Sequence, residues 1–262
     1  MRHQLQILLI QMLLLAAANS AAADAPACTR TFTLALHEHG MLYSAKTDAG
    51  IDKDLSDELI RRSGCKITVS LMARARIWQL LESGALDFSL SGIHNEAREK
   101  FAGFAWYFSN KYYLLVRKDA NVGNLSDFEA NPTLKLGVIR SFRYSRNANQ
   151  LVDQLNLEGR VSYASSLEPL YEILRINRIQ GMIIEPFDYS QVESDPIRDL
   201  TTIVDSGDDS IRHGLIMSKS SIPLQEQEKW RALVNGMRSD GTMLRIFEKY
   251  FKPDLARSMV NF

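Results

Sequence analysis

The chain has 262 residues, 45% of them hydrophobic, and equal numbers of basic and acidic side chains, 31 of each. This length is sufficient for one large domain or for two smaller ones. A nearly neutral chain without a Lys/Arg cluster lacks the electrostatic footprint of proteins that bind nucleic acid or anionic membranes. We therefore expect no nucleic-acid partner.

Residues 1–23 have the pattern of a secretory signal peptide. Arg2 precedes an apolar run over residues 5–18, and small residues follow up to Ala23. The run is too short for a membrane anchor, which needs about 20 apolar residues. We expect cleavage after Ala23, which leaves 30 basic and 31 acidic side chains and a formal charge of −1.

Strands and helices alternate along the rest of the chain. The apolar patterns predict strands over 32–36, 67–71, 86–90, 112–116, 134–139, 161–163 and 181–184, and helices over 52–62, 75–82, 146–155 and 167–176. This alternation is typical of parallel sheets with helices on both faces.

Two polar stretches, 118–125 and 204–211, are the candidate crossovers between two lobes. Two crossovers make one lobe discontinuous. We predict a first lobe built from residues 24–117 and 205–262, with a second lobe, 118–204, inserted between its two parts.

The two cysteines lie just before the first and second predicted strands, at Cys28 and Cys65. The starts of neighbouring parallel strands can be close enough for a disulfide, and an exported protein meets an oxidising environment. We favour a Cys28–Cys65 bridge over two unpaired buried thiols.

The segment 83–118 carries the strongest functional pattern. A short strand ends at Ser91-Gly92, where the glycine would let a ligand approach the backbone, and Arg98 follows soon after. Arginine is the side chain best shaped for bidentate capture of a carboxylate. Ligands of open α/β sheets bind beyond the carboxyl ends of the strands, which is where these residues stand.

Four segments, in the same order, resemble the bacterial periplasmic solute-binding proteins of family 3, the polar amino-acid type with the type II periplasmic binding fold. They are Gly50–Leu55, the region from Ser91 to Arg98, His213–Lys219 and Gly241–Phe251. The resemblance implies an α/β protein of two lobes, each a parallel-rich sheet flanked by helices, joined by two hinge crossovers. It also implies a periplasmic monomer that captures an amino-acid-like solute for an inner-membrane ABC permease, or that reports the solute to a receptor.

The strand ends and the family positions together give ten candidate ligand-binding residues: Tyr43, Arg74, Ser91, Gly92, His94, Arg98, Arg140, Ser141, Phe142 and Glu185. The resemblance places the carboxylate-binding arginine at Arg98. It gives Glu185 the position of an acid that binds the ammonium group of the ligand.

The other candidates have simpler assignments. Tyr43 would supply an aromatic wall, and Ser141-Phe142 stands at a helix N-terminus, where free N–H groups favour anions. For Arg74 and Arg140 a surface ion pair is the alternative. Arg76 is expected to lie on a solvated helix face.

A catalytic or metal-dependent function is less well supported. His37 and His39 would share one face of a strand, but zinc needs three or four ligands and the sequence has no further His or Cys cluster. Nucleophile elbows and phosphate-binding loops are absent too. We expect no metal, no cofactor and no enzyme activity. The alternative is a dehydratase on the same fold, acting on cyclohexadienyl acids with Glu185 or His94 as general acid.

Overall fold

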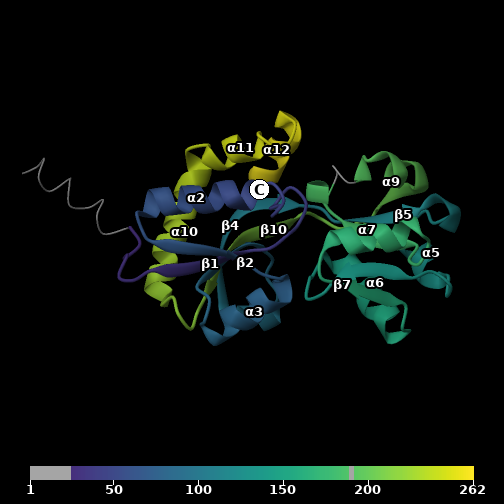
Figure 1. Ribbon diagram of the computed structural model, residues 1–262, viewed down its shortest axis with the longest axis horizontal. Coiled ribbons are helices and arrows are strands. Elements are labelled where there is room, and N and C mark those ends of the chain that lie inside the picture. Colours follow the sequence, from purple (N-terminus) through teal and green to yellow (C-terminus); the bar gives the residue numbers. More distant parts are fainter. Residues whose placement is uncertain (1–24, 189–191) are drawn as a thin grey trace, which may run out of the picture.

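The computed structural model describes residues 25–188 and 192–262, and these form two lobes, each built around its own five-stranded sheet (Figure 1). The predicted signal peptide, residues 1–23, lies outside the described residues. The fold is α/β and two-lobed, as the sequence predicts.

The sheet of the first lobe has the strand order β2-β1-β3-β10-β4. Its strands are β1 (Phe32–Leu36), β2 (Ile67–Leu71), β3 (Phe88–Gly92), β4 (Ala102–Asn110) and β10 (Ile211–Ser218). Strand β1 pairs in parallel with β2 and β3, whereas β10 runs antiparallel between β3 and β4. The C-terminal part of the chain therefore completes a sheet that the N-terminal part begins.

Helices cover both faces of this sheet. They are α2 (Ile51–Ser63), α3 (Arg74–Ser83), α4 (Glu96–Glu99), α10 (Leu224–Ser239), α11 (Thr242–Phe247) and α12 (Pro253–Val260). Figure 1 shows α3 on the face of the sheet opposite α2, α11 and α12. Strand alternation explains both cores, because Leu34 and Leu36 are buried towards the α2 side and Ala35 towards Ile77 of α3.

The second lobe has the strand order β7-β6-β8-β5-β9. Its strands are β5 (Tyr113–Arg117), β6 (Leu136–Ile139), β7 (Val161–Ala164), β8 (Gly181–Ile184) and β9 (Thr201–Asp205). Its helices are α5 (Leu125–Ala130), α6 (Arg146–Leu157), α7 (Leu167–Arg175) and α9 (Asp195–Leu200), with short 3-10 turns η1 (Lys118–Ala120) and η2 (Pro186–Asp188). Strands β6, β7 and β8 are parallel, and β5 is antiparallel to β8 and β9.

Strand β5 belongs to the sheet of the second lobe, although the sequence analysis assigns residues 113–117 to the first lobe and the first crossover to 118–125. The apolar pattern of Tyr113–Val116 indicates a buried strand but not which sheet it joins. We propose lobe boundaries at Lys111–Tyr112, between β4 and β5, and within residues 206–210, between β9 and β10.

A third segment passes between the lobes at η2. Phe187 of this turn is fully buried in the core of the first lobe, where its ring centroid lies 5.2 Å from that of Phe108 and 5.6 Å from that of Phe251. The backbone N–H of Met41 donates to the Phe187 carbonyl at 2.9 Å. A Cβ on Gly40, whose φ is +47°, would lie 2.4 Å from this carbonyl oxygen, so the close approach requires glycine there.

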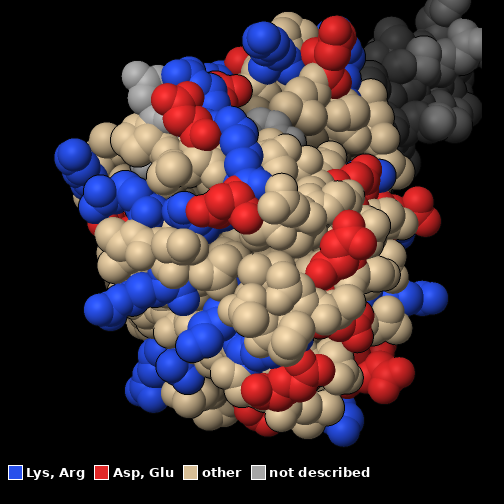
Figure 2. All heavy atoms as spheres, turned by 90° about the vertical axis from the view of Figure 1, so that its right-hand side faces the viewer, with Lys and Arg blue, Asp and Glu red and all other residues tan. Residues whose placement is uncertain are grey.

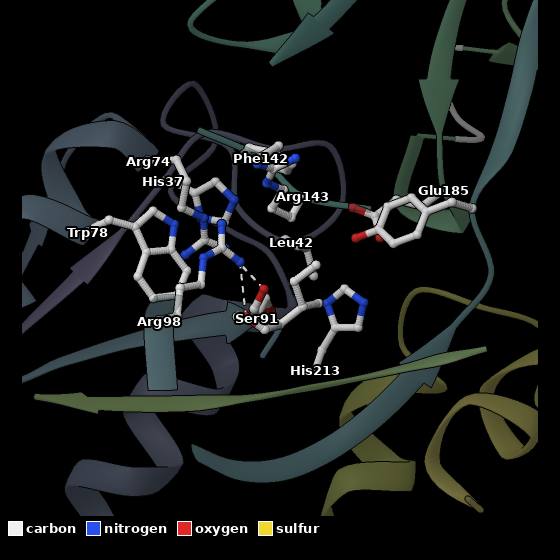
Figure 3. A pocket seen from close by; sticks show the side chains of 13 residues that line it. His37, Leu42, Arg74, Trp78, Ser91, Arg98, Phe142, Arg143, Glu185 and His213 are labelled. Atoms are coloured by element: carbon white, nitrogen blue, oxygen red, sulfur yellow. Dashed lines mark hydrogen bonds between the residues drawn. The ribbon is translucent and has the colours of Figure 1, made fainter. Parts of the chain in front are cut away.

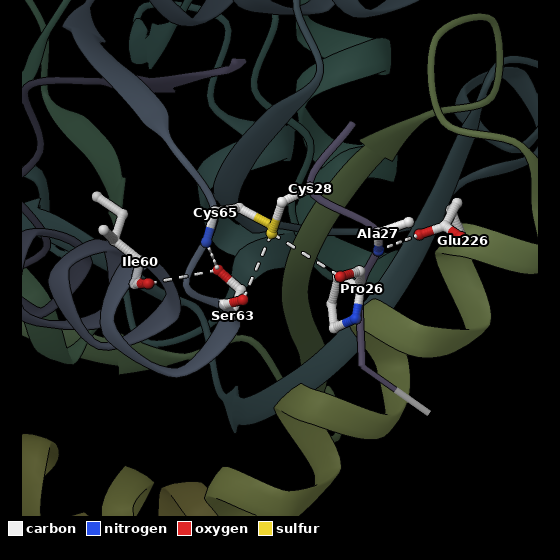
Figure 4. Close-up of a disulfide and its surroundings, with 7 residues drawn as sticks. All are labelled: Pro26, Ala27, Cys28, Ile60, Ser63, Cys65 and Glu226. Carbon is white, nitrogen blue, oxygen red and sulfur yellow. Dashed lines mark hydrogen bonds between the residues drawn. A yellow bond between two sulfur atoms is a disulfide. The ribbon is translucent and has the colours of Figure 1, made fainter. Parts of the chain in front are cut away.

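Cys28 and Cys65 form a disulfide, as the sequence predicts (Figure 4). The bridge fastens the segment before β1 to the turn before β2. The backbone N–H of Ala27 donates to Glu226 of α10 at 2.9 Å, which adds a second attachment. The start of the described chain is thus fixed to two elements of the first lobe.

The exposed end of the second lobe carries both signs of charge. Figure 2 shows basic and acidic side chains separated by uncharged residues, with neither sign covering this face. Within the described part of the chain, no helix is both long and apolar enough to cross a membrane.

Candidate functional site

A small cavity, with about 20 Å³ of space for the centres of water-sized molecules, lies where the two lobes meet (Figure 3). Its lining comes from the ends of β1 and β3, from α3 and α4, and from segments of the second lobe near β6 and β8. The lining residues are His37, Leu42, Arg74, Trp78, Ser91, Gly92, Ile93, Arg98, Tyr112, Phe142, Arg143, Glu185 and His213. Six of the ten residues proposed from the sequence are among them.

Arg74 lies in the first turn of α3 and points under the end of β3. Its guanidinium donates to the carbonyl oxygens of Leu90 at 3.1 Å and Ser91 at 3.0 Å, and to Ser89 Oγ at 3.4 Å. Only 5% of the residue is exposed. The alternative role, a surface ion pair, is therefore excluded by its burial.

Arg98 projects from α4 towards the second lobe. Asn95 caps this helix by accepting from the Arg98 backbone N–H at 2.8 Å, which fixes the start of the turn that carries the arginine. The guanidinium donates to the carbonyls of Ile93 at 3.0 Å and Ser141 at 2.9 Å, the latter in the second lobe. Arg98 is 8% exposed.

Both guanidiniums rest against the same indole ring. Their Cζ atoms lie 3.9 Å (Arg98) and 5.9 Å (Arg74) from the ring centre of Trp78, and Arg74 also lies 5.7 Å from the ring centre of Phe142. Trp78 follows Arg74 by four residues on α3, so the helix presents both side chains on one face. Aromatic faces stabilise cations by about 0.5–2 kcal/mol.

The two arginines have no carboxylate partner in the described part of the chain, where neutral carbonyl and hydroxyl oxygens accept their hydrogen bonds. Burial lowers the pKa of Arg74. Burial, together with the charge of Arg74, also lowers the pKa of Arg98, to about 9. Removing an ion from water costs several kcal/mol unless an opposite charge compensates it. The cavity therefore carries two buried cations without a contacting counter-charge.

Glu185 follows β8 and faces the cavity, but both of its carboxylate oxygens already have protein partners. His39 Nε2 lies 2.7 Å from Oε1, and Asn110 Nδ2 donates to Oε2 at 2.8 Å. His39 and Glu185 are each 3% exposed at the side chain, and Asp188 lies 3.7 Å from the same imidazole.

The charges in this cluster support one another. Burial disfavours protonated His39, but the carboxylates of Asp188 and Glu185 outweigh it and raise the pKa of His39. Burial likewise disfavours ionised Glu185, but the hydrogen bond and charge of His39 outweigh it and lower the pKa of Glu185. Burial raises the pKa of Asp188 to about 7. His39 and Glu185 thus form a buried hydrogen-bonded pair between the lobes, and their mutual pKa shifts favour the imidazolium–carboxylate form.

Ser91 and Gly92 line the cavity, but their contacts differ from those expected. The Ser91 hydroxyl donates to Asp52 at 2.6 Å, and the Ser91 backbone N–H donates to the hydroxyl of Tyr107 at 2.6 Å. A Cβ on Gly92 would lie 2.3 Å from the Ile216 side chain, so the absence of a side chain here makes room for packing against β10. Neither donor group of Ser91 is free for a ligand in this arrangement.

Four of the proposed residues lie outside the cavity lining. Tyr43 donates to Asp48 at 3.0 Å, and His94 pairs with Glu99 on the surface at 3.0 Å. Arg140 is exposed and lies over the ring of Tyr163. Ser141 contributes only its carbonyl, to Arg98. Their positions after strands are as predicted, but strand ends do not determine where side chains point.

Seven lining residues are not among the ten proposed from the sequence: His37, Leu42, Trp78, Ile93, Tyr112, Arg143 and His213. The sequence could have indicated two of them, since His37 directly follows β1 and Trp78 lies one helical turn beyond Arg74. His213 belongs to a strand and Tyr112 to the segment between the lobes, so only the folded chain brings them here. Arg143 is exposed and paired with Asp153 at 3.1 Å.

Two lobes with a cavity between them that is lined by residues of both are the arrangement of a two-lobed solute-binding protein. The sequence pattern of the bacterial extracellular solute-binding proteins, family 3, matches residues 38–253. The chain belongs to this family, as the sequence predicts. No curated protein sequence matches it.

Solved structures with the same fold have low sequence identity. An ancestral arginine-binding protein bound to arginine is 21% identical, with a TM-score of 0.71 over 86% of this chain and 100% of that chain. A histidine kinase sensor domain with similarity to periplasmic binding proteins is 13% identical, with a TM-score of 0.71 over 86% of this chain and 97% of that one. A Streptococcus pneumoniae ABC uptake transporter substrate-binding protein with bound histidine is 16% identical, with a TM-score of 0.68 over 84% and 92%.

Proposed function

We propose that the protein captures a small carboxylate-bearing solute, similar in size to an amino acid, in the cavity between its lobes. The observation that carries this proposal is the pair of buried guanidiniums, Arg74 and Arg98, that have no protein carboxylate beside them. A ligand carboxylate would supply the negative charge that these guanidiniums lack, and its two oxygens would accept two parallel N–H hydrogen bonds from one guanidinium.

Arg98 is the main anchor in this proposal. Its guanidinium has five N–H donors, of which the carbonyls of Ile93 and Ser141 take two. The Ser141 contact joins the lobes, so a ligand bound at Arg98 would lie beside lining residues of both. Trp78 and Phe142 would enclose the apolar part of the solute.

Delivery to an inner-membrane ABC permease from the periplasm is the role we infer for the captured solute. Membership of a family of extracellular solute-binding proteins, the disulfide and the N-terminal signal pattern support this location. The Streptococcus pneumoniae relative, which belongs to an ABC uptake transporter, supports the transport role. In this role the protein is a monomer and performs no catalysis.

Thermal unfolding of the mature protein with amino acids, organic acids and small peptides tests the proposal. A ligand present at 100 times its Kd stabilises by about 2.7 kcal/mol. For a chain of this size, each kcal/mol of stabilisation raises Tm by roughly 2–4 °C. If no carboxylate-bearing solute raises Tm at millimolar concentration, the capture proposal fails.

The Arg98→Ala variant locates the binding site. Loss of a desolvated charge partner costs about 2–5 kcal/mol of binding, a weakening of roughly 30-fold to several thousand-fold. Arg76→Ala, an exposed arginine on α3, is the matched control and should bind as the wild type does. Equal affinity of wild type and Arg98→Ala for the identified solute would rule out this anchor.

A sensory role is the second candidate, and the histidine kinase sensor domain of the same fold favours it. Both roles use the same solute-bound form. Uptake of labelled solute by cells with and without the gene separates them: transport predicts lost uptake, whereas sensing predicts normal uptake with a lost transcriptional response. Turnover of prephenate-like compounds would instead reveal a dehydratase.

A further inference from the structure

The charges that face the cavity are unequal. Arg74 and Arg98 are buried cations held only by neutral oxygen atoms. Glu185 is the only carboxylate among the lining residues. Figure 3 shows Arg74 and Arg98 beside Trp78, with Glu185 on the other side of the cavity.

Both carboxylate oxygens of Glu185 already have partners within the protein. His39 contacts one of its carboxylate oxygens at 2.7 Å and Asn110 donates to the other at 2.8 Å. An ammonium group brought to this point would meet a carboxylate whose two oxygens already have partners, and would add a cation beside His39, whose own pKa is raised. The attraction that normally holds a ligand ammonium is therefore largely cancelled here.

The side of the cavity near Arg74 retains donors instead. Three of its hydrogen bonds engage the two terminal nitrogens, which leaves further N–H groups of the five in a guanidinium. Beside it, His37 is 3% exposed and neither of its ring nitrogens has a partner among the described residues. Buried polar atoms without partners are rare, and a neutral imidazole can donate one N–H bond to an anion.

Two separate guanidinium forks match two separate carboxylates. Both guanidiniums lie against one indole ring, at 3.9 and 5.9 Å from its centre, so a short molecule could contact both. One carboxylate at Arg98 would leave Arg74 without a contacting carboxylate, because Asp52 and Glu185 attract its charge only from beyond ion-pair distance. An ammonium group would increase the positive charge.

We propose that the ligand is a small dicarboxylate without an ammonium group, with one carboxylate at Arg98 and the other at Arg74 and His37. This inference rests on the proposed function, since it specifies the solute that the same cavity takes. It makes Arg74 the residue that distinguishes a dicarboxylate from a monocarboxylate.

Isothermal titration of the mature protein with matched acids tests the inference. The panel pairs succinate with aspartate and butyrate, and glutarate with glutamate and valerate, and adds adipate and isophthalate as longer and aromatic dicarboxylates. We expect at least one dicarboxylate to bind at least tenfold more tightly than the α-amino acids and the monocarboxylates.

The outcomes separate this inference from the proposed function. If aspartate, glutamate or a monocarboxylate binds as tightly as every dicarboxylate, the dicarboxylate inference is overturned and carboxylate capture stands. If none of the acids binds at millimolar concentration, both are overturned.

Variants then assign the two carboxylates. Arg74→Gln should remove the preference for the dicarboxylate, with at least a tenfold loss for it and little change for the monocarboxylate. Arg98→Gln should weaken both, and Arg76→Gln neither. Equal losses for both acids in Arg74→Gln would contradict the assignment. If Arg74→Gln does not fold, Arg74→Lys retains the cation without the fork, and the wild-type comparison of succinate with butyrate remains decisive.

Discussion

Substitution of Phe187 measures how strongly the second lobe is attached to the first. It comes from the turn after β8 but is fully buried among Phe108, Phe247 and Phe251 in the core of the first lobe. Removing a buried Phe side chain costs about 3–5 kcal/mol. We expect Phe187→Ala to lower the free energy of unfolding by this amount, and to weaken the coupling between lobes.

Tryptophan fluorescence makes this prediction specific, because Trp78, Trp106 and Trp230 all belong to elements of the first lobe. Urea unfolding followed by fluorescence reports that lobe, and far-UV circular dichroism reports both. Phe187→Ala should shift the fluorescence transition to lower urea.

Phe128 supplies a matched control. It is equally buried, but in the core of the second lobe. Phe128→Ala should affect the fluorescence transition less than Phe187→Ala does. A fluorescence-detected loss below about 1 kcal/mol for Phe187→Ala would refute the anchoring role.

Three further predictions concern the ion pair, the disulfide and the lobes. The pKa of Glu185 is lowered from 4.5, so its contribution to stability is complete above pH 4.5 and is lost as the pH falls through the lowered pKa. The pKa of His39 is raised from 6.5, so its contribution is complete below pH 6.5 and is lost as the pH rises through the raised pKa. Stability should therefore decline on both sides of a mildly acidic optimum. Asp188, whose pKa burial raises to about 7, adds to the alkaline decline, so the double variant His39→Gln/Asp188→Asn should flatten it in urea titrations; an unchanged profile would contradict this. Replacing Cys28 and Cys65 by serine opens a loop of sequence separation 37 and should cost about 4 kcal/mol, whereas a Tm equal to that of the wild type would show that the bridge adds nothing. Contacts from both lobes should favour a closed form when the ligand binds, so X-ray scattering should show a smaller radius of gyration at saturation than for an open ligand-free protein; no change would show that one lobe suffices.

The sequence predicts the architecture well because burial patterns are local. The alternation of apolar strands and helices gives the two-lobed α/β fold, and the strand starts give the Cys28–Cys65 bridge. The sheet to which Tyr113–Arg117 belongs is not predictable in this way. A buried strand has the same pattern whichever neighbours it pairs with, and only the assembled sheet selects β8 and β9.

The site is predictable in position more than in chemistry. Arg98 and Arg74 lie at the cavity because they follow strands whose ends meet there. Arg140 also follows a strand but points to solvent, since side-chain direction depends on the turn. The pairing of Glu185 with His39 joins residues 146 positions apart, and no local pattern indicates it.

The strand order of the first lobe has a consequence for how the chain acquires its structure as it is made from its N-terminus. Strand β10 separates β3 from β4, so both strands expose unpaired backbone edges until residues 211–218 are available. The second lobe is contiguous and can complete its sheet earlier. The first lobe must wait for the end of the chain, and long-range pairing of this kind is slow and open to aggregation. A truncation before β10 should therefore yield a folded second lobe attached to an aggregation-prone, half-built sheet.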